Sequence, residues 1–325
     1  MIAVVGAAGT IGRVVCAFLD DWRVPFARRD FRLEGDEHVD ARDPQSLRRA
    51  LDGASVCVNC VDYRLNVRVM EGALAAGTHY VDLGGLFHVT RTQLELDGRF
   101  RSRSLTAIIG MGSAPGKTNL LAKLAIQELD DEPRSLEIWA ATRDPAAAEH
   151  PLPITYSAQT LIDELTMPPV VLREGELIEV EPLSGKAMLR LPEVGEASGV
   201  YTLHSELATL PASYPSLREA SFRLSLPDGL VEKLLALGEE RPEPYVQSPQ
   251  AVAVHHVHVN HPGGASATTT TRGGSARSTA EPAARAAAEL AAARISTPGV
   301  HAAETAIADA EEFLRQLDTE LSIEA

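Results

Sequence analysis

Short apolar runs alternate with amphipathic stretches over the first 120 residues. The apolar runs are typical of buried strands, and the stretches between them carry apolar residues at helical spacing. The pattern predicts strands at 2–5, 24–27, 55–61, 79–83 and 105–110, and helices near 11–21, 44–52, 64–76 and 90–103. Because strands and helices alternate as they do in βαβ units, we expect a doubly wound parallel sheet.

From residue 135 the pattern changes to strand after strand, which indicates a mixed or antiparallel sheet. Strands are predicted at 135–142, 170–174, 177–180, 187–191, 199–202, 220–226, 251–259 and 265–272, with helices near 157–166 and 229–237. Pro282 is expected in the first turn of an alanine-rich helix that ends at Arg294, and another helix is expected at 301–317. The prediction is therefore an α/β protein with a first domain at 1–120, an α+β domain at 121–278, and closing helices at 279–325 that return to the first domain.

The composition of the chain limits the kinds of molecule that it could bind. The chain has 325 residues, 45% of them hydrophobic, and a formal net charge of −15. This acidity argues against nucleic acid or an anionic membrane and favours a small molecule. The apolar N-terminus lacks a basic segment and is broken by Gly6, so it is interpreted as a strand rather than a signal peptide. No apolar run approaches the ~18 residues of a membrane span, and we expect a cytoplasmic protein.

A glycine-rich turn follows the first predicted strand. It consists of Gly6-Ala7-Ala8-Gly9-Thr10-Ile11-Gly12. In such a turn the glycines permit a tight bend, close approach of a pyrophosphate and close packing of the next helix, whose N–H groups face the anion. Because a strand precedes the turn and an amphipathic segment follows it, we expect a Rossmann domain that binds a dinucleotide through Gly6, Ala8, Gly9, Thr10, Ile11 and Gly12.

The end of the second strand indicates which dinucleotide. An NAD-specific site usually has an acidic residue about 20 residues after the first glycine. Here Arg28 and Arg29 precede the acid, and guanidinium groups favour a 2′-phosphate, although both could be surface residues. The prediction is NADP, with NAD possible. Asp43, Cys60 and Val61 are weaker candidates for contacts with the adenosine half.

Cysteines and histidines give no metal site. Cys57 and Cys60 form a CxxC within an extended run, which favours buried strand thiols over a redox motif. Four histidines cluster near one strand: His255, His256, His258 and His261. Strand alternation turns His255 away from His256 and His258, and no cysteine or carboxylate nearby completes a ligand set, so no metal is predicted.

Two further motifs end predicted strands, where open α/β sheets bind ligands. They are Tyr80-Val81-Asp82-Leu83-Gly84-Gly85 and Gly110-Met111-Gly112-Ser113-Ala114-Pro115-Gly116-Lys117. The second is not a P-loop, because Met111 replaces a required glycine and Pro115 lacks an N–H. Gly84 and Gly112 are expected to contact the cofactor.

With the glycine-rich turn and the later stretch 201–206, these motifs resemble the saccharopine dehydrogenase family, most closely its lysine 6-dehydrogenase-like members. The resemblance implies a Rossmann domain joined to a catalytic domain that also forms a homodimer. It implies oxidation of an amine, or reduction of an imine, on an amino-acid substrate such as lysine or a lysine derivative. An imine-reducing opine or polyamine-type synthase, and a dinucleotide-binding sensor without turnover, are the alternatives.

Amine oxidation requires loss of a proton from nitrogen, because a free amine titrates near ~10.4. Five residues are candidates for this chemistry: Asp82, Tyr80, Lys117, His204 and Glu206. Asp82 could instead accept N–H groups of the Gly84–Gly85 turn, Tyr80 could pack, and Lys117 could be solvated. His204 and Glu206 are expected on one face of an extended segment, where they could pair or be structural.

Overall fold

The computed structural model describes residues 1–227, 229–260 and 263–325 and divides into two compact units. Unit 1 contains residues 1–116 and 279–308, and unit 2 contains residues 117–278 and 309–325. The long helix α10 (Gly274–Ala291) includes the boundary between Ser278 and Thr279. Residues 309–325 thus belong to unit 2, whereas the sequence led us to expect the whole stretch 279–325 with the first domain.

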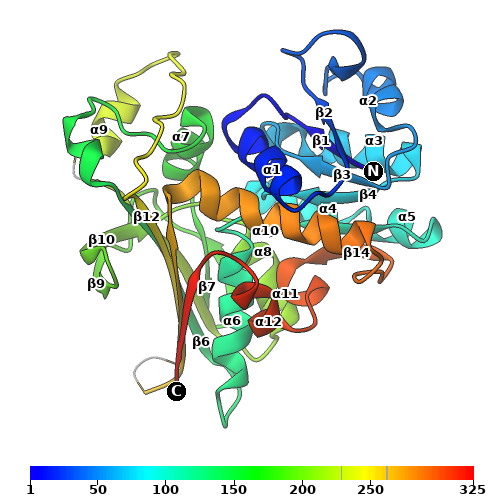
Figure 1. Ribbon diagram of the computed structural model, residues 1–325. Coiled ribbons are helices and arrows are strands. Elements are labelled where there is room, and N and C mark those ends of the chain that lie inside the picture. The colour runs from blue at the N-terminus through cyan, green and yellow to red at the C-terminus, as the bar shows by residue number, and fades with distance from the viewer. Residues whose placement is uncertain (228, 261–262) are drawn as a thin grey trace. The chain divides into compact units, whose positions relative to one another are not determined.

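In its described residues, unit 1 contains a six-stranded parallel sheet in the order β14-β5-β4-β3-β1-β2 (Figure 1). Val4, Val58, Val81 and Ile108 are completely buried, so the central strands form the core. The strands are β1 (Ile2–Val5), β2 (Phe26–Arg29), β3 (Val56–Asn59), β4 (His79–Asp82), β5 (Thr106–Ile109) and β14 (Gly299–Ala302). The helices are α1 (Thr10–Asp21), η1 (Gly35–Glu37), α2 (Pro44–Leu51), η2 (Tyr63–Leu65), α3 (Asn66–Ala76), α4 (Leu86–Leu94), α5 (Asp97–Ser102) and α11 (Ala303–Ala306).

Unit 2 is built on a mixed sheet, nine-stranded in its described part, with the order β15-β13-β12-β6-β11-β10-β9; β7 pairs with β11 and β8. The β6–β11 pair is parallel, and the other pairs are antiparallel. The strands are β6 (Ser135–Arg143), β7 (Val170–Arg173), β8 (Glu176–Glu179), β9 (Ala187–Leu191), β10 (Gly195–Tyr201), β11 (Glu219–Ser225), β12 (Val252–Val259), β13 (Ser266–Arg272) and β15 (Glu320–Glu324). The helices are α6 (Lys117–Gln127), η3 (Pro145–Glu149), α7 (Ala158–Thr166), α8 (Glu206–Ser213), α9 (Leu230–Leu235) and α12 (Ala310–Arg315).

The closing segment differs most from the prediction. Pro282 lies inside α10 rather than in its first turn, and the expected helix at 301–317 contains β14, α11 and α12. The strand β14 pairs with β5, and β15 pairs with β13. Strands of four and five residues are too short to show a clear alternation, so the neighbouring strand decides their conformation.

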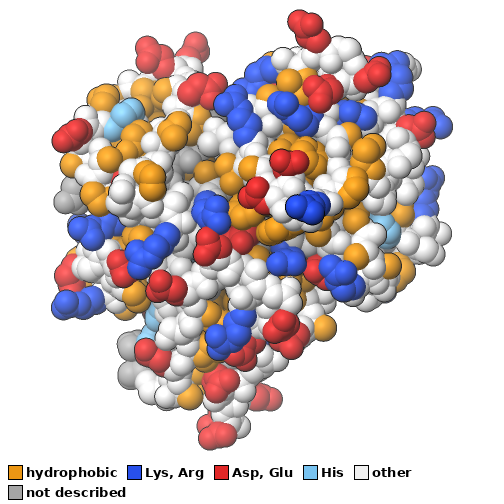
Figure 2. Space-filling view, in the orientation of Figure 1, with side chains coloured by type: hydrophobic (Ala, Val, Ile, Leu, Met, Phe, Trp, Pro, Cys, Tyr) orange, Lys and Arg blue, Asp and Glu red, His pale blue; other side chains and the backbone are white. Residues whose placement is uncertain are grey.

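The surface agrees with a protein of mixed charge. Acidic and basic side chains are interspersed on the face shown in Figure 2. No helix in the described residues combines the length and the apolar character needed to cross a membrane.

Candidate functional site

The glycine-rich turn of unit 1 joins β1 to α1 and leaves no room for side chains. Gly6 has a φ of +85°, and a β-carbon there would lie 2.8 Å from the carbonyl carbon and oxygen of Cys60. A β-carbon on Gly12 would lie 2.0 Å from the Gly6 oxygen. The helix α1 has no side-chain cap and no acidic residue in its first turn, so its open N–H groups suit a pyrophosphate. Thr10, Ile11 and Gly12 carry the first N–H groups of α1, and the Cys60 backbone lies against the turn. Contact of these residues with a cofactor stays a prediction.

Two of the predicted adenosine contacts, Arg29 and Asp43, have side chains that bind elsewhere. Arg29 donates from Nε to the Ala50 oxygen at 3.0 Å, while Arg28 is exposed on the opposite face of β2. Asp43 accepts the Gln45 N–H at 2.9 Å and so caps α2. The two arginine side chains therefore leave β2 on opposite sides, and their contact with the cofactor stays a prediction. The side chains of Asp30 and Arg32 reach the turn from the segment after β2, and Arg13 Nε donates to the Ala8 oxygen at 2.8 Å.

Asp82 and Tyr80 are completely buried at the end of β4. Asp82 Oδ1 accepts N–H groups from Gly110 at 2.7 Å and Gly84 at 3.0 Å. Its Oδ2 accepts the Tyr80 hydroxyl at 3.0 Å and the side-chain amide of Gln93. Burial raises the pKa of Asp82 more than these hydrogen bonds lower it. A buried carboxylate with four donors fixes the ends of β4 and β5, which favours the structural alternative, and a catalytic role for Asp82 and Tyr80 stays a prediction.

Gly84 and Gly112 allow these strand ends to lie close together. Gly84 has a φ of +124°, and a β-carbon on Gly112 would lie 2.8 Å from the Leu83 oxygen. Their contact with a cofactor stays a prediction. The cysteines fit the predicted strand thiols, since Cys57 lies in β3 and burial raises the pKa of both Cys57 and Cys60.

Lys117 begins α6 in unit 2 and is only 1% exposed. Its Nζ donates to Thr271 Oγ1 and to Ser278 Oγ, both at 2.6 Å. The solvated alternative is therefore wrong. A buried ammonium is expensive unless polar groups surround it, so its position indicates a polar interior over the sheet.

His204 lies at the centre of that interior. Its ring stacks on Phe222 with a centroid distance of 3.6 Å and an interplanar angle of 14°. Its Nδ1 lies 3.2 Å from Glu206 Oε2, and its Nε2 lies 3.8 Å from Glu164 Oε1. Glu206 begins α8 rather than continuing an extended segment, which corrects that expectation, but the predicted pairing of imidazole and carboxylate is present. Both ring nitrogens therefore face a carboxylate.

Two hydroxyls extend this arrangement. Thr118 donates to Glu206 Oε1 at 2.7 Å, and Tyr156 donates to Glu164 Oε2. The result is a continuous series of polar groups, Tyr156, Glu164, His204, Glu206 and Thr118, contributed by α6, α7, α8 and the segments before α7 and α8. We refer to it as the acid–base chain.

Proton affinities in the acid–base chain depart from ordinary values. Burial lowers the pKa of His204, but the charges of Glu206 and Glu164 and the hydrogen bond to Glu206 outweigh it, so the pKa is raised. Burial raises the pKa of Glu164. For the adjacent His255, burial and the nearby charges of Lys117 and His204 hold the pKa well below its ordinary value. The histidines thus differ, His204 favouring the charged form and His255 the neutral form.

The histidines of β12 separate by face, as alternation predicts. His255 is paired across the sheet with Thr269, and within the described residues His255 Nδ1 and Thr269 Oγ1 are buried without a hydrogen-bond partner. His256 lies on the other face, with Nδ1 2.8 Å from Thr268 Oγ1, and its ring meets that of His258 edge-on. His261 lies outside the described residues. Among the residues described, no group of three or more His, Cys, Asp or Glu side chains is arranged to hold a metal ion.

The chain is similar in sequence to known dehydrogenases. Residues 33–108, all in unit 1, match the model for the saccharopine dehydrogenase NADP binding domain. A curated relative, carboxyaminopropylagmatine dehydrogenase from Synechocystis sp., is 24% identical over 262 residues. Within residues 33–108 the chain is thus similar to the saccharopine dehydrogenase family. The aligned region covers 73% of this chain and 65% of the Synechocystis relative, so it spans slightly less than two thirds of that protein.

A solved structure has the same fold as this chain. Apo saccharopine dehydrogenase (L-Glu forming) from Saccharomyces cerevisiae superimposes with a TM-score of 0.67 at 13% identity, over 100% of this chain and 99% of that one. The likeness confirms the predicted α/β class, with a Rossmann-type parallel sheet and a second, mixed sheet.

The sequence analysis did not single out Glu164 or Tyr156. Glu164 lies on the buried side of α7 with Ala158, Leu161 and Leu165. A glutamate within an apolar helical stripe is the signal that was available, because an acidic residue there must find a buried partner. Tyr156 carries no such signal.

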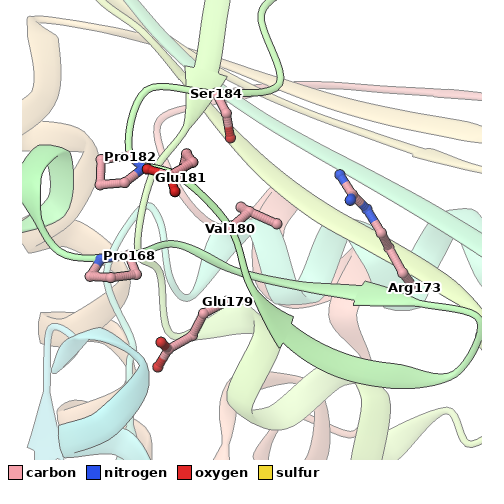
Figure 3. Close-up of a pocket in the computed structure, with 7 residues that line it drawn as sticks. All are labelled: Pro168, Arg173, Glu179, Val180, Glu181, Pro182 and Ser184. Carbon is pink, nitrogen blue, oxygen red and sulfur yellow. The ribbon is translucent and has the colours of Figure 1, made fainter.

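Unit 2 also contains a surface hollow beside the β7–β8 hairpin, with a volume of about 600 Å³. Figure 3 shows Arg173 on β7, with Glu181 and Ser184 on the loop that follows β8. None of the acid–base chain residues is among the residues that line it, so we do not assign the chemistry to this hollow.

Proposed function

We propose that this protein is an NADP-dependent oxidoreductase that oxidises an amine of an amino-acid-type substrate, or reduces the corresponding imine. The observation that carries the proposal is the buried acid–base chain, with His204 between Glu206 and Glu164. Its supports are the glycine-rich turn of unit 1 and the similarity of residues 33–108 to the saccharopine dehydrogenase NADP binding domain. A histidine whose charge is tuned by two carboxylates is suited to proton transfer in the neutral pH range.

The residues present fit the dinucleotide, since the turn has glycine where β-carbons would collide and α1 begins without a cap. Gly6, Gly9 and the N–H groups of Thr10, Ile11 and Gly12 would hold its pyrophosphate. When bound, the nicotinamide accepts or donates a hydride. The protein's own contribution is to bind and orient both reactants and to move the proton.

Proton transfer falls to His204. An amine must become neutral before hydride can leave its carbon, and its ordinary pKa of about 10.4 requires an acceptor or a pocket that favours the neutral form. In its neutral form His204 takes up the proton at a ring nitrogen, and Glu206 and Glu164 stabilise the imidazolium that results. Tyr156, hydrogen-bonded to Glu164, extends the series of groups over which a proton can be shared.

The substrate class follows from the charges in the same interior. Lys117 provides a buried positive charge that suits a substrate carboxylate, and the unpartnered His255 Nδ1 and Thr269 Oγ1 provide further polar contacts. Lysine or a lysine derivative is the first candidate. A polyamine-type substrate is the second, because the Synechocystis relative is named for a carboxyaminopropyl derivative of agmatine.

The test is a spectrophotometric screen with NADP and NAD, following nicotinamide absorbance with lysine, saccharopine and carboxyaminopropylagmatine. The reverse direction is tested with the reduced coenzymes and mixtures of an aldehyde and an amine. We expect turnover of at least one of these substrates with NADP, and its loss in the His204→Gln variant. Coenzyme binding without turnover of any amine or imine would instead identify a dinucleotide-binding sensor.

We further propose that the protein works as a cytoplasmic homodimer formed through unit 2. Light scattering on the purified protein and fractionation of cells that express it test these two points.

A further inference from the structure

The acidic residue at the end of β2 has an unexpected position. Asp30 stands where an NAD-specific domain places the carboxylate that binds the ribose 2′-hydroxyl. In this structure Asp30 is only 2% exposed. Its Oδ2 accepts the Ala8 N–H at 3.0 Å, and its Oδ1 accepts the backbone N–H of Arg32 at 2.9 Å and Arg32 Nε–H at 3.2 Å. Asp30 therefore ties the glycine-rich turn to Arg32 and presents no exposed oxygen to a ribose.

Asp30 is held as an anion in that position. Burial raises its pKa, but the hydrogen bonds from Arg32 and Ala8 and the charge of Arg32 outweigh burial, so the pKa lies below its ordinary value. A charged acceptor makes stronger hydrogen bonds to N–H donors than a neutral one. The link between the turn and Arg32 is consequently fixed rather than incidental.

Arg32 reaches the turn from the segment after β2, whereas Arg13, whose Nε donates to the Ala8 oxygen at 2.8 Å, reaches it from α1. A β-carbon on Gly9 would lie 3.5 Å from Arg32 Nη2. The Arg32 side chain is 40% exposed, and within the described residues its only side-chain hydrogen bond is made by Nε. Its two Nη groups thus form an open fork beside the turn, a geometry that matches phosphate oxygens.

Phe31, the residue between Asp30 and Arg32, adds an apolar surface. Phe31 is 61% exposed, an uncommon exposure for a large aromatic side chain, and the Arg32 guanidinium lies 5.4 Å from its ring centroid. A flat ring of this kind can stack on a purine base. The segment 30–32 therefore offers a fixed cation and an aromatic face at the carboxyl end of β2, where Rossmann domains bind the adenosine half.

We propose that Arg32, positioned by Asp30, selects NADP over NAD by binding the 2′-phosphate, and that Phe31 faces the adenine. This inference rests on the proposed function and deepens it. It replaces Arg28 and Arg29 as the predicted phosphate contacts.

The test measures dissociation constants of NADP and NAD by calorimetry on the full-length protein, without any substrate. We expect Arg32→Ala to weaken NADP binding roughly 10- to 100-fold, the equivalent of one or two charged hydrogen bonds, and to leave NAD binding unchanged. Arg32→Lys should recover part of the loss, because it keeps the charge without the fork. The matched control is Arg101→Ala, which removes another aspartate-paired arginine of unit 1, located before the amino end of β5. It should change neither constant.

The Asp30→Asn variant tests whether Asp30 positions the Arg32 side chain. We expect it to lower the preference for NADP by a smaller factor than Arg32→Ala, whereas a purely structural role would weaken both coenzymes equally and lower Tm. If Asp30→Asn does not fold, the Arg32 variants still decide the question, because Arg32 is partly exposed.

Three results would overturn the inference. Equal weakening of NADP and NAD in Arg32→Ala would make Arg32 a pyrophosphate contact. Selective loss of NADP binding in Arg28→Ala, with Arg32→Ala unaffected, would restore the prediction from sequence. If the unmodified protein binds neither coenzyme, the proposed function fails together with this inference, and that outcome is distinct from the other two.

Discussion

The buried carboxylates of the two units have different hydrogen-bonding partners. In unit 1 the buried carboxylates of Asp82 and Asp30 each accept two backbone N–H groups as well as side-chain donors. In unit 2 the buried carboxylates of Glu206 and Glu164 face an imidazole and hydroxyl groups. Backbone amides cannot exchange protons usefully near neutral pH, whereas imidazole and carboxyl groups can. Burial alone therefore does not identify a catalytic acid or base, whereas the chemistry of the groups that surround the buried side chain does.

The His204→Gln variant is the strongest test of a catalytic role for the acid–base chain of unit 2. We expect turnover to fall by about 10²- to 10⁴-fold, the usual contribution of a general acid or base, while the dissociation constant for NADP stays the same. The matched control is His258→Gln, on the opposite face of the same sheet. Equal losses in the two variants would show that unit 2 is merely sensitive to its histidines.

A second test removes the buried cation of unit 2. Lys117→Met should reduce kcat/KM by roughly 10- to 100-fold, because a charged group that contacts the substrate is lost. The exposed Lys186→Met variant serves as control, and steady-state kinetics with the best substrate measure both. Unchanged kinetics in Lys117→Met would assign this lysine a structural role, like that of the unit 1 carboxylates.

A third test concerns the structural role of the buried Asp82 carboxylate in unit 1. Asp82→Asn should lower the free energy of unfolding by about 2–3 kcal/mol, because an amide cannot accept all the donors that now face the carboxylate. Denaturant unfolding measures the loss. The folded variant should keep its kcat, and a large fall in kcat at saturating coenzyme would return Asp82 to the catalytic residues.

The smallest expected effect concerns pH. Glu206 helps raise the pKa of His204 in the folded protein, so their pairing stabilises the fold fully below the ordinary histidine pKa of about 6.5. That stabilisation is lost as the pH rises through the raised folded-state pKa. Glu206→Gln should move this loss, and the His204-dependent limb of the activity profile, to lower pH. Unfolding free energies and kcat/KM measured over the neutral range check the direction, and an unchanged profile would contradict it.

Local signals carried most of the fold prediction. The strands and helices of the first domain were predicted to within a few residues, because each combines an apolar run with a glycine or capping signal nearby. One helix predicted at 90–103 is two helices, α4 and α5. The strands β14 and β15 escaped prediction, since each depends on a neighbour far away in the sequence.

The candidate site shows the same division. His204 and Glu206 are two residues apart, so spacing alone suggested their pairing. Glu164 is 40 positions before His204, and Thr118 is 88 positions before Glu206, which no local pattern reveals. The sequence indicated Arg28 and Arg29 because they stand at the strand end, and only the contacts of Asp30 show that Arg32 lies beside the turn.

The glycine-rich turn, the change from βαβ units to a strand-rich domain, and the resemblance to saccharopine dehydrogenases could be read from the sequence, because these depend on the order and spacing of nearby residues. The tertiary structure decided which charges are held by backbone amides and which by one another. That distinction arises only when segments distant in the chain pack together and exclude water, since a buried ionisable group takes its proton affinity from whatever surrounds it.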